Sequence, residues 1–176
     1  MDFYKNDIQL RSANIDDTKE ILEIYSYYVL NTSISFDYEV PSFDEFRQKI
    51  QKTLEKYPYY VALSDNKIVG YAYAGPFVGR EAYKYSAELT VYIDKNYTKH
   101  GIGKLLYQKL EDDLKQKGIK NLYACIGTPA EKADEYIDFN SVEFHKHLGF
   151  RQVGEFKKCG FKFNRWLNMV WLEKFI

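Results

Sequence analysis

The sequence is poor in cysteine and contains no long apolar run. Its two cysteines, Cys125 and Cys159, are too few for a disulfide framework and lack the C-x-x-C spacing of zinc or redox sites. We therefore expect both to be reduced and predict no metal site. The first residues have no apolar signal-peptide core, and no stretch approaches the roughly 20 apolar residues that span a bilayer. A cytoplasmic protein without a membrane partner is the expectation.

An excess of charge of either sign is also missing. The 25 Lys and Arg balance the 25 Asp and Glu, so net charge provides no broad attraction to nucleic acid, which we do not expect as a partner. A chain of 176 residues fits one core, and we predict a single domain over residues 1–176. Aromatic residues are plentiful, with 17 Tyr and 12 Phe, and either line a pocket or reflect composition alone.

Capping-box spacing marks the starts of two early helices: Asp17 with Glu20, and Ser42 with Glu45, the second helix being ended by Pro58. Apolar residues at helical spacing follow each pair. The segment between the two helices is rich in serine and threonine and reads as a loop. A loop in this place can overhang a site.

Apolar and alternating runs predict seven strands, at residues 8–11, 59–63, 67–74, 87–93, 119–126, 150–155 and 163–173. Leucines four apart predict a helix over 102–117 that Gly118 ends, and a shorter helix is expected at 142–148. Helices interleaved with strands in this order require a central mixed sheet with helices on both faces. The predicted fold class is α/β, or α+β by a stricter convention.

The segment Thr98-Lys99-His100-Gly101-Ile102-Gly103-Lys104 joins a predicted strand to the most regular helix. Two glycines let backbone N–H groups turn toward one point, and the helix N-terminus adds partial positive charge, so the segment suits an anion. Lys99 and Lys104 would add full charges. The segment lacks the G-K-[ST] ending of a P-loop and the third glycine of a dinucleotide site. A tight connection without a ligand is the alternative.

A carboxylate interrupts the apolar strand 87–93. Period-2 alternation places Glu88 on one face with Thr90 and Tyr92, and the alternate apolar residues on the other face. Burying an unpaired carboxylate is costly, so its position suggests a water-lined cleft and a raised pKa suited to a general base. An edge-strand glutamate in solvent or a structural ion pair is the alternative.

Together these segments resemble the acetyl-CoA site of the GNAT superfamily, and longer stretches resemble its phosphinothricin N-acetyltransferase branch. The resemblance runs in order from about Leu10 to Trp171. The matching residues are Thr32 to Phe36, Tyr71 to Pro76, Arg80, Ala82-Tyr83, Ala87-Glu88, Thr90 to Tyr92, Gly101-Ile102-Gly103, Ser141-Val142, His145, Leu148-Gly149-Phe150, Gly160-Phe161-Lys162 and Trp166.

The resemblance implies a geometry for the co-substrate acetyl-CoA. The strand bearing Glu88 would splay from the strand at 119–126, and the pantetheine arm would enter that gap and pair with backbone groups from Val91 through Tyr92 to Ile93. The pyrophosphate would lie on residues 99–104. Glu88 would accept the proton of the acceptor ammonium, and a backbone N–H near Val91 would stabilise the oxyanion.

The resemblance also suggests how the leaving thiolate and the coenzyme are handled. His145 occupies a position where many superfamily members have a tyrosine acid, so it is a candidate acid or substrate contact. The alternative is a polar helix residue without a catalytic role. Asp138 aligns with an asparagine that contacts pantetheine, and Asn140 follows two residues later. Thr98 replaces the usual Gln or Arg of the phosphate loop, which leaves part of the cradle to Lys99 or Lys104.

For the acceptor, the resemblance implies a small amino-acid-like amine, contacted by Phe36, Arg80, Tyr83 and Lys162. A guanidinium at Arg80 would bind a carboxylate in a bidentate manner. A homodimer is implied as well. The acidic stretch 127–140 keeps open a second acceptor class, protein N-termini or polyamine-like cations. The departures at Thr98 and Asp138 keep open a non-catalytic acetyl-CoA-binding module.

Overall fold

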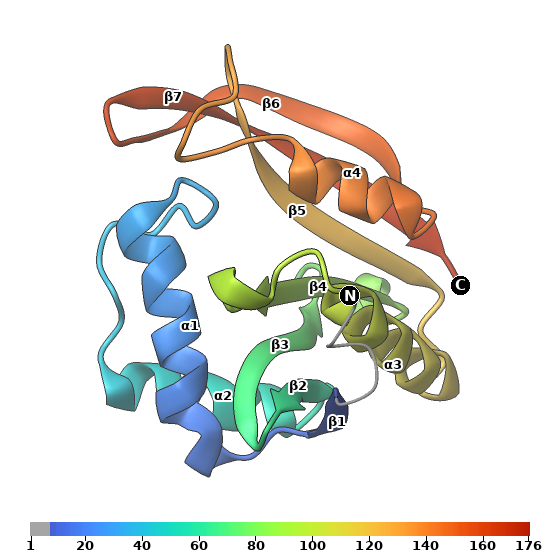
Figure 1. The fold of residues 1–176 in the computed structure, drawn as a ribbon. Coiled ribbons are helices and arrows are strands. Elements are labelled where there is room, and N and C mark those ends of the chain that lie inside the picture. The colour runs from blue at the N-terminus through green and yellow to red at the C-terminus, as the bar shows by residue number, and fades with distance from the viewer. Residues whose placement is uncertain (1–7) are drawn as a thin grey trace.

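The computed structural model describes residues 8–176, whose strands and helices alternate along the chain (Figure 1). Short 3₁₀ turns occupy residues 15–17, 81–83 and 95–97. The main elements are β1 (Gln9–Ser12), α1 (Thr18–Asn31), α2 (Phe43–Leu54), β2 (Tyr59–Ser64), β3 (Lys67–Pro76), β4 (Ser86–Ile93), α3 (Ile102–Gln116), β5 (Asn121–Pro129), α4 (Asn140–His147), β6 (Arg151–Lys162) and β7 (Arg165–Phe175). The predicted order of elements is confirmed.

The strands form one mixed sheet in the order β1-β2-β3-β4-β5-β7-β6. Every neighbouring pair is antiparallel except β4 and β5, which are parallel. These two strands pair only where Ser86–Glu88 lies beside Asn121–Tyr123, although β4 continues to Ile93 and β5 to Pro129. The predicted splay of the central strands is therefore confirmed, and it begins at Glu88.

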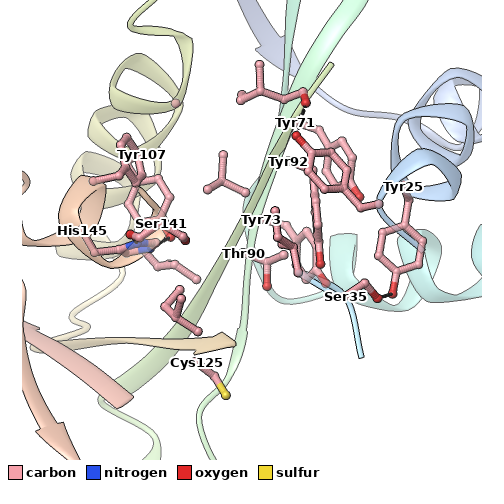
Figure 2. A pocket seen from close by; sticks show the side chains of 18 of the residues that line it. Tyr25, Ser35, Tyr71, Tyr73, Thr90, Tyr92, Tyr107, Cys125, Ser141 and His145 are labelled. Carbon is pink, nitrogen blue, oxygen red and sulfur yellow. Dashed lines mark hydrogen bonds between the residues drawn. The ribbon is translucent and has the colours of Figure 1, made fainter. Parts of the chain in front are cut away.

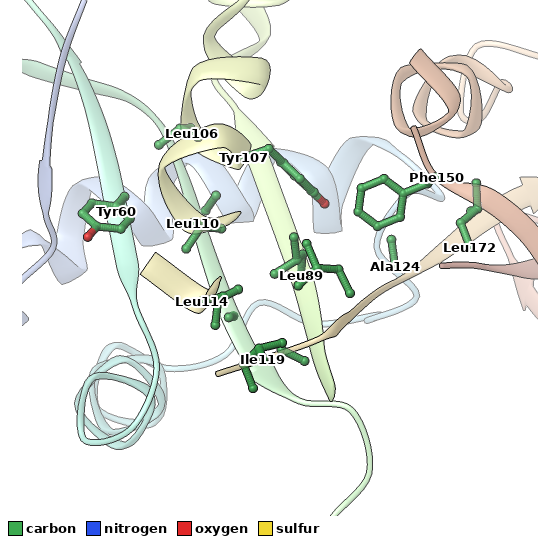
Figure 3. Close-up of a cluster of buried hydrophobic side chains, with 14 of the residues drawn as sticks. Tyr60, Leu89, Leu106, Tyr107, Leu110, Leu114, Ile119, Ala124, Phe150 and Leu172 are labelled. Carbon is green, nitrogen blue, oxygen red and sulfur yellow. The ribbon is translucent and has the colours of Figure 1, made fainter. Parts of the chain in front are cut away.

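Helices cover both faces of the sheet, as predicted (Figure 1). On one face, Leu106, Leu110 and Leu114 of α3 are fully buried against Leu89 of β4 and neighbouring strands (Figure 3). On the other face, α1 and α2 bury a second cluster, including Ile21 and Ile50, against β2 and β3. Because β4 contributes alternate residues to both clusters, its two faces belong to different layers of the molecule. No helix within residues 8–176 is long and apolar enough to cross a membrane.

The predicted capping box is present at the start of α2 but not at the start of α1. Ser42 and Glu45 form a reciprocal capping box at α2, as predicted. Asp17 is the N-cap of α1 but makes no side-chain cap bond there, so the predicted box of Asp17 with Glu20 is wrong. A box formed by Asn14 and Asp17 instead caps the 3₁₀ turn at residues 15–17, just before α1. The Asp17 carboxylate is already used, because it accepts the Asn14 backbone N–H and a bidentate pair of bonds from Arg11.

The turn chemistry of the hairpins is clear in the backbone. Asp65 and Asn66, between β2 and β3, both have positive φ, at 49° and 63°, as a two-residue hairpin turn requires. Strand β6 is longer than predicted, and β7 has the predicted length but lies two residues further along the chain. The two strands meet at a second such turn, where Phe163 and Asn164 have φ of 49° and 59°. Most of β6 is exposed on both faces, so its sequence lacks the apolar alternation that marks a strand.

Candidate active site

A cleft of about 1130 Å³ opens where β4 and β5 separate. Tyr107 and His145 lie on one side of β4, and Tyr25, Tyr73 and Tyr92 lie on the other (Figure 2). The cleft thus connects the two layers through the gap in the sheet. The structure brings most predicted site residues to its wall: Phe36, Glu88, Val91, Tyr92, Ile93, Lys99, Gly101, Ile102, Gly103, Lys104, Asp138, Asn140 and His145.

The edge of β4 that faces the gap carries main-chain groups without a strand partner. The backbone N–H of Asp94 donates to the Val69 carbonyl, across from β4 on β3. In an antiparallel pair only every second residue bonds to the same neighbour, so Tyr92 and Thr90 also direct their backbone N–H and C=O groups to β3. The residues between them, including Val91 and Ile93, direct theirs toward β5, which has already diverged. The hydroxyl of Tyr28 donates to the Ile93 carbonyl at 2.5 Å. Val91 is therefore the better placed of the two to pair with an extended ligand.

The start of α3 has the features of an anion site. Its N-cap, Gly101, has φ of 79°, and no side chain caps the helix. The first turn contains no acidic residue, so the positive end of the helix dipole is uncompensated. A Cβ at Gly101 would meet nothing within 4 Å, which leaves open space above the turn. Lys99, with φ of 64°, and Lys104 both line the cleft beside it.

Glu88 is the last residue of β4 that pairs with β5, and the gap between the two strands begins there. Its side chain is half-buried and lines the cleft. Among the described residues, none donates a hydrogen bond to its carboxylate or forms an ion pair with it within 4 Å. Burial raises the pKa of Glu88 above the ordinary 4.5, and the charge of Lys49 partly opposes the shift. An unpaired carboxylate with a raised pKa at a cleft is suited to accept a proton.

His145 is fully enclosed, with 1% of its surface exposed. Its Nδ1 lies 2.6 Å from the Ser141 carbonyl, which can only accept, so Nδ1 carries the proton. The neutral ring then accepts at Nε2 from the Tyr107 hydroxyl, 2.7 Å away. Burial lowers the pKa of His145, which favours this neutral form. The geometry does not fit the predicted acid role, because neither ring nitrogen offers a proton to the cleft.

Tyr107 is the residue that sequence reasoning missed on this side. It is buried on α3, lines the cleft, and stands edge-on to the His145 ring at 5.3 Å. In the sequence, Tyr107 stands among the apolar residues of an amphipathic helix, which indicates a buried residue of the hydrophobic core and not a residue of a binding site. Since its proton is directed to His145, its oxygen lone pairs are the part of the hydroxyl that remains for other donors.

Lys162 does not line the cleft, contrary to the implied acceptor contact. Its side chain is buried, and Nζ donates to the carbonyls of Val29 and Ser35, each at 2.8 Å. The Val29 carbonyl lies in the last turn of α1, and the N–H that would continue the helix, that of Ser33, donates instead to Tyr136. Lys162 replaces the missing helical donor and ties the loop after α1 to β6.

Replacement of Lys162 by methionine is therefore expected to destabilise the fold. Two buried carbonyls would lose a charged donor, at a cost of about 2–3 kcal/mol in the free energy of unfolding. Urea denaturation measures this cost. Lys157→Met on the exposed part of β6 is the matched control, and we expect it to change stability by less than about 0.5 kcal/mol. Equal stability of the two variants would contradict this role for Lys162.

Three further predicted residues lie outside the cleft wall. Arg80 is exposed on the loop after β3, and Tyr83 packs edge-on against Phe77 with ring centroids 5.6 Å apart. His100 is exposed at the turn before α3, with Nδ1 3.1 Å from the Thr98 carbonyl. Acceptor contacts by Arg80 and Tyr83, and the homodimer, stay predictions.

Two of the four acids in the acidic stretch, Asp134 and Asp138, stabilise its own loop. Asp134 accepts the backbone N–H groups of Tyr136 and Ile137 and forms an ion pair with Arg165 at 2.7 Å. The Arg165 guanidinium in turn lies 4.0 Å from the Tyr136 ring centre. Of the stretch's four acids, only Asp138 lines the cleft, where it accepts bonds from the backbone and side chain of Asn140. Glu131 and Glu135 are exposed and lie outside the cleft wall.

The half of the cleft covered by α1 and α2 is built largely from tyrosine. Tyr73 and Tyr92 project from β3 and β4, and Tyr25 projects from α1 (Figure 2). Tyr25 and Tyr92 meet edge-on at 5.3 Å, and the Tyr25 hydroxyl donates to Asp37. The Phe36 ring lies so close to Gly127 and Gly160 that a Cβ at either would meet it within 2.7 Å. The abundance of tyrosine in the sequence therefore has a structural use here.

Comparison with known proteins agrees with this geometry. A family model described as an acetyltransferase (GNAT) domain matches residues 10–171. A phosphinothricin N-acetyltransferase of Streptomyces coelicolor is 33% identical, with 96% of each chain covered. An L-methionine sulfoximine/L-methionine sulfone acetyltransferase of Salmonella typhimurium is 27% identical, covering 93% of this chain and 92% of its own. A phosphinothricin acetyltransferase from Sinorhizobium meliloti, solved in complex with acetyl-CoA, superposes with a TM-score of 0.88 at 32% identity, covering 96% of this chain and 88% of that one.

Proposed function

Because the chain belongs to the GNAT family of acetyltransferases, whose co-substrate is acetyl-CoA, we propose that it acetylates the primary amine of a small amino-acid-like molecule with Glu88 as general base. The single observation that carries the proposal is the Glu88 carboxylate, which is half-buried and unpaired among the described residues at the point where β4 leaves β5. The names of the relatives support the acceptor class.

The residues of the cleft fit the coenzyme. The uncapped start of α3, with Lys99 and Lys104 beside it, suits the pyrophosphate. The free main-chain edge of β4 at Val91 suits the amide groups of the pantetheine arm. His100 is not needed for this arrangement, because backbone N–H groups and the two lysines supply the positive charge. When bound, acetyl-CoA supplies an acetyl group activated as a thioester.

The protein's part in the reaction is proton transfer and orientation. The amine that attacks must first lose a proton, and Glu88 accepts it directly or through water. The C–N bond then forms as the C–S bond breaks, and the departing thiolate takes up, directly or through water, the second proton that the attacking nitrogen loses. Among the described cleft residues, Cys125 is the one thiol, and burial raises its pKa to about 12, so it stays protonated and is a poor nucleophile. This favours direct transfer over an acetyl-enzyme.

The test is release of CoA thiol with a panel of amines: amino acids, sulfoximines, polyamines and peptides with free N-termini. Acetylated products are identified by mass spectrometry. We expect turnover with the first two classes. Turnover with peptides or polyamines alone would replace the acceptor class, and the commitment of Asp134 to its own loop argues against that result. Calorimetric binding of CoA without turnover of any amine would reduce the protein to a binding module.

A further inference from the structure

The lysines that line the cleft fall into two groups. Lys99 and Lys104 stand at the start of α3, beside the uncapped helix end. Lys49, on α2, is the other lysine on the wall, and among the described residues that line the cleft there is no arginine. Lys49 therefore provides the cation on the tyrosine-lined half, away from the proposed phosphate site.

Lys49 and Glu88 face the same half of the cleft. The Lys49 Nζ lies 5.7 Å from the centre of the Tyr73 ring. Tyr73 pairs with Thr90 across the β3–β4 ladder, and Thr90 shares a face of β4 with Glu88, two residues away. The positive charge of Lys49 lowers the pKa of Glu88, which agrees with the two side chains facing the same half of the cleft. No carboxylate of the described residues lies within 4 Å of Nζ, so the ammonium is not committed to an ion pair.

We propose that Lys49 binds the anionic group of the acceptor, and that it does so in the place the sequence suggested for Arg80. The inference rests on the proposed function. A free amino acid carries an ammonium and a carboxylate on one carbon, so a site that recognises it needs an anion and a cation close together. Glu88 and Lys49 both line the cleft and are such a pair. Lys49 and Arg80 are both exposed, but Arg80 lies on a loop outside the cleft wall.

A different role for Lys49 makes a different prediction. If Lys49 only tuned Glu88, its removal would raise the pKa of Glu88 further, since the attraction that lowers it would be lost. The acid limb of the kcat/KM profile would then move to higher pH by the same amount for every acceptor. Recognition of the acceptor, by contrast, changes KM only for acceptors that carry the anionic group.

The experiment compares matched acceptors with Lys49→Gln and wild type. Each pair is an amino acid and the amine that lacks only its carboxylate, for example L-methionine sulfoximine and its decarboxylated form. We expect KM for the amino acid to rise by about 10- to 100-fold, with KM for the amine unchanged, because a charged hydrogen bond is lost only in the first case. Lys52→Gln, on the same helix but outside the cleft wall, is the control and is expected to match wild type for both.

Arg80→Gln is measured in parallel. A selective rise of KM for the amino acid in Arg80→Gln, with Lys49→Gln unaffected, would overturn the inference and restore the assignment based on the sequence. An equal change for both acceptors in Lys49→Gln would also overturn it, as would wild-type enzyme that acetylates amines but no amino acids. If wild type acetylates no amine at all, the proposed function fails and the inference fails with it.

Discussion

Glu88→Gln is expected to lower kcat/KM on any active acceptor by roughly 10²- to 10⁴-fold, the usual contribution of a general base. Glutamine keeps the shape of the side chain but cannot accept the proton of the ammonium. The unpaired carboxylate at the start of the gap between β4 and β5 is the group that would lose this capacity. CoA-thiol release at saturating acetyl-CoA measures the loss.

Stability separates this loss from unfolding. Burial raises the pKa of Glu88, so the ionised carboxylate costs folding free energy at pH values above that pKa. The neutral glutamine removes that cost, and we expect the melting temperature of Glu88→Gln at neutral pH to equal or exceed that of wild type. Glu131→Gln, an exposed substitution away from the cleft, is the control for both measurements. A folded Glu88→Gln with activity near that of wild type would remove Glu88 from its role.

The pH profile tests the same residue in the intact enzyme. Only ionised Glu88 accepts a proton, so kcat/KM is full above its pKa and falls as the pH drops through it. Since the pKa is raised, this acid limb is expected above the 4.5 of an ordinary glutamate. The limb should be absent from the residual activity of Glu88→Gln. An acid limb that persists unchanged in the variant would belong to another group.

The features that local sequence determined were predicted well. The leucines of α3, the capping box of Ser42 with Glu45, and the alternation around Glu88 each act through neighbours a few positions away. Local patterns are enough to define such elements. The resemblance implied the splay of β4 from β5, and the two strands do meet at only three residue pairs. The strand order was not predicted, because it depends on pairings between strands distant in the chain.

The predicted roles that the geometry does not favour depend on partners distant in the chain. Lys162 is held by carbonyls more than 120 positions away, and His145 by a hydroxyl on another helix. Nothing near either residue in the sequence distinguishes a buried structural role from a substrate contact. Lys49 was overlooked for the same reason, since a lysine on an amphipathic helix usually faces solvent. Only the packing of α2 over the sheet brings it to the cleft.

His145→Ala is expected to reduce stability more than any other single change considered. The substitution leaves a cavity among Tyr107, Phe144 and Phe150, and deprives the Tyr107 hydroxyl and the Ser141 carbonyl of their partners. The combined cost is about 3–5 kcal/mol in the free energy of unfolding, or roughly 6–20 °C in melting temperature for a chain of this size. His147→Ala, on the exposed side of the same helix, is the matched control and should cost far less.

The pH dependence of stability distinguishes this structural role from an acid. Burial lowers the pKa of His145 from 6.5, so the unfolded chain binds a proton that the folded protein resists. The stabilisation by neutral His145 is fully present above pH 6.5 and is lost as the pH falls through the lowered folded pKa. The stability difference between wild type and His145→Ala should therefore narrow at acidic pH. The opposite result would be a His145 variant that is as stable as wild type but has a lower kcat and no basic limb in its pH–rate profile. That result would identify His145 as the acid and refute the tautomer assigned from Ser141 and Tyr107.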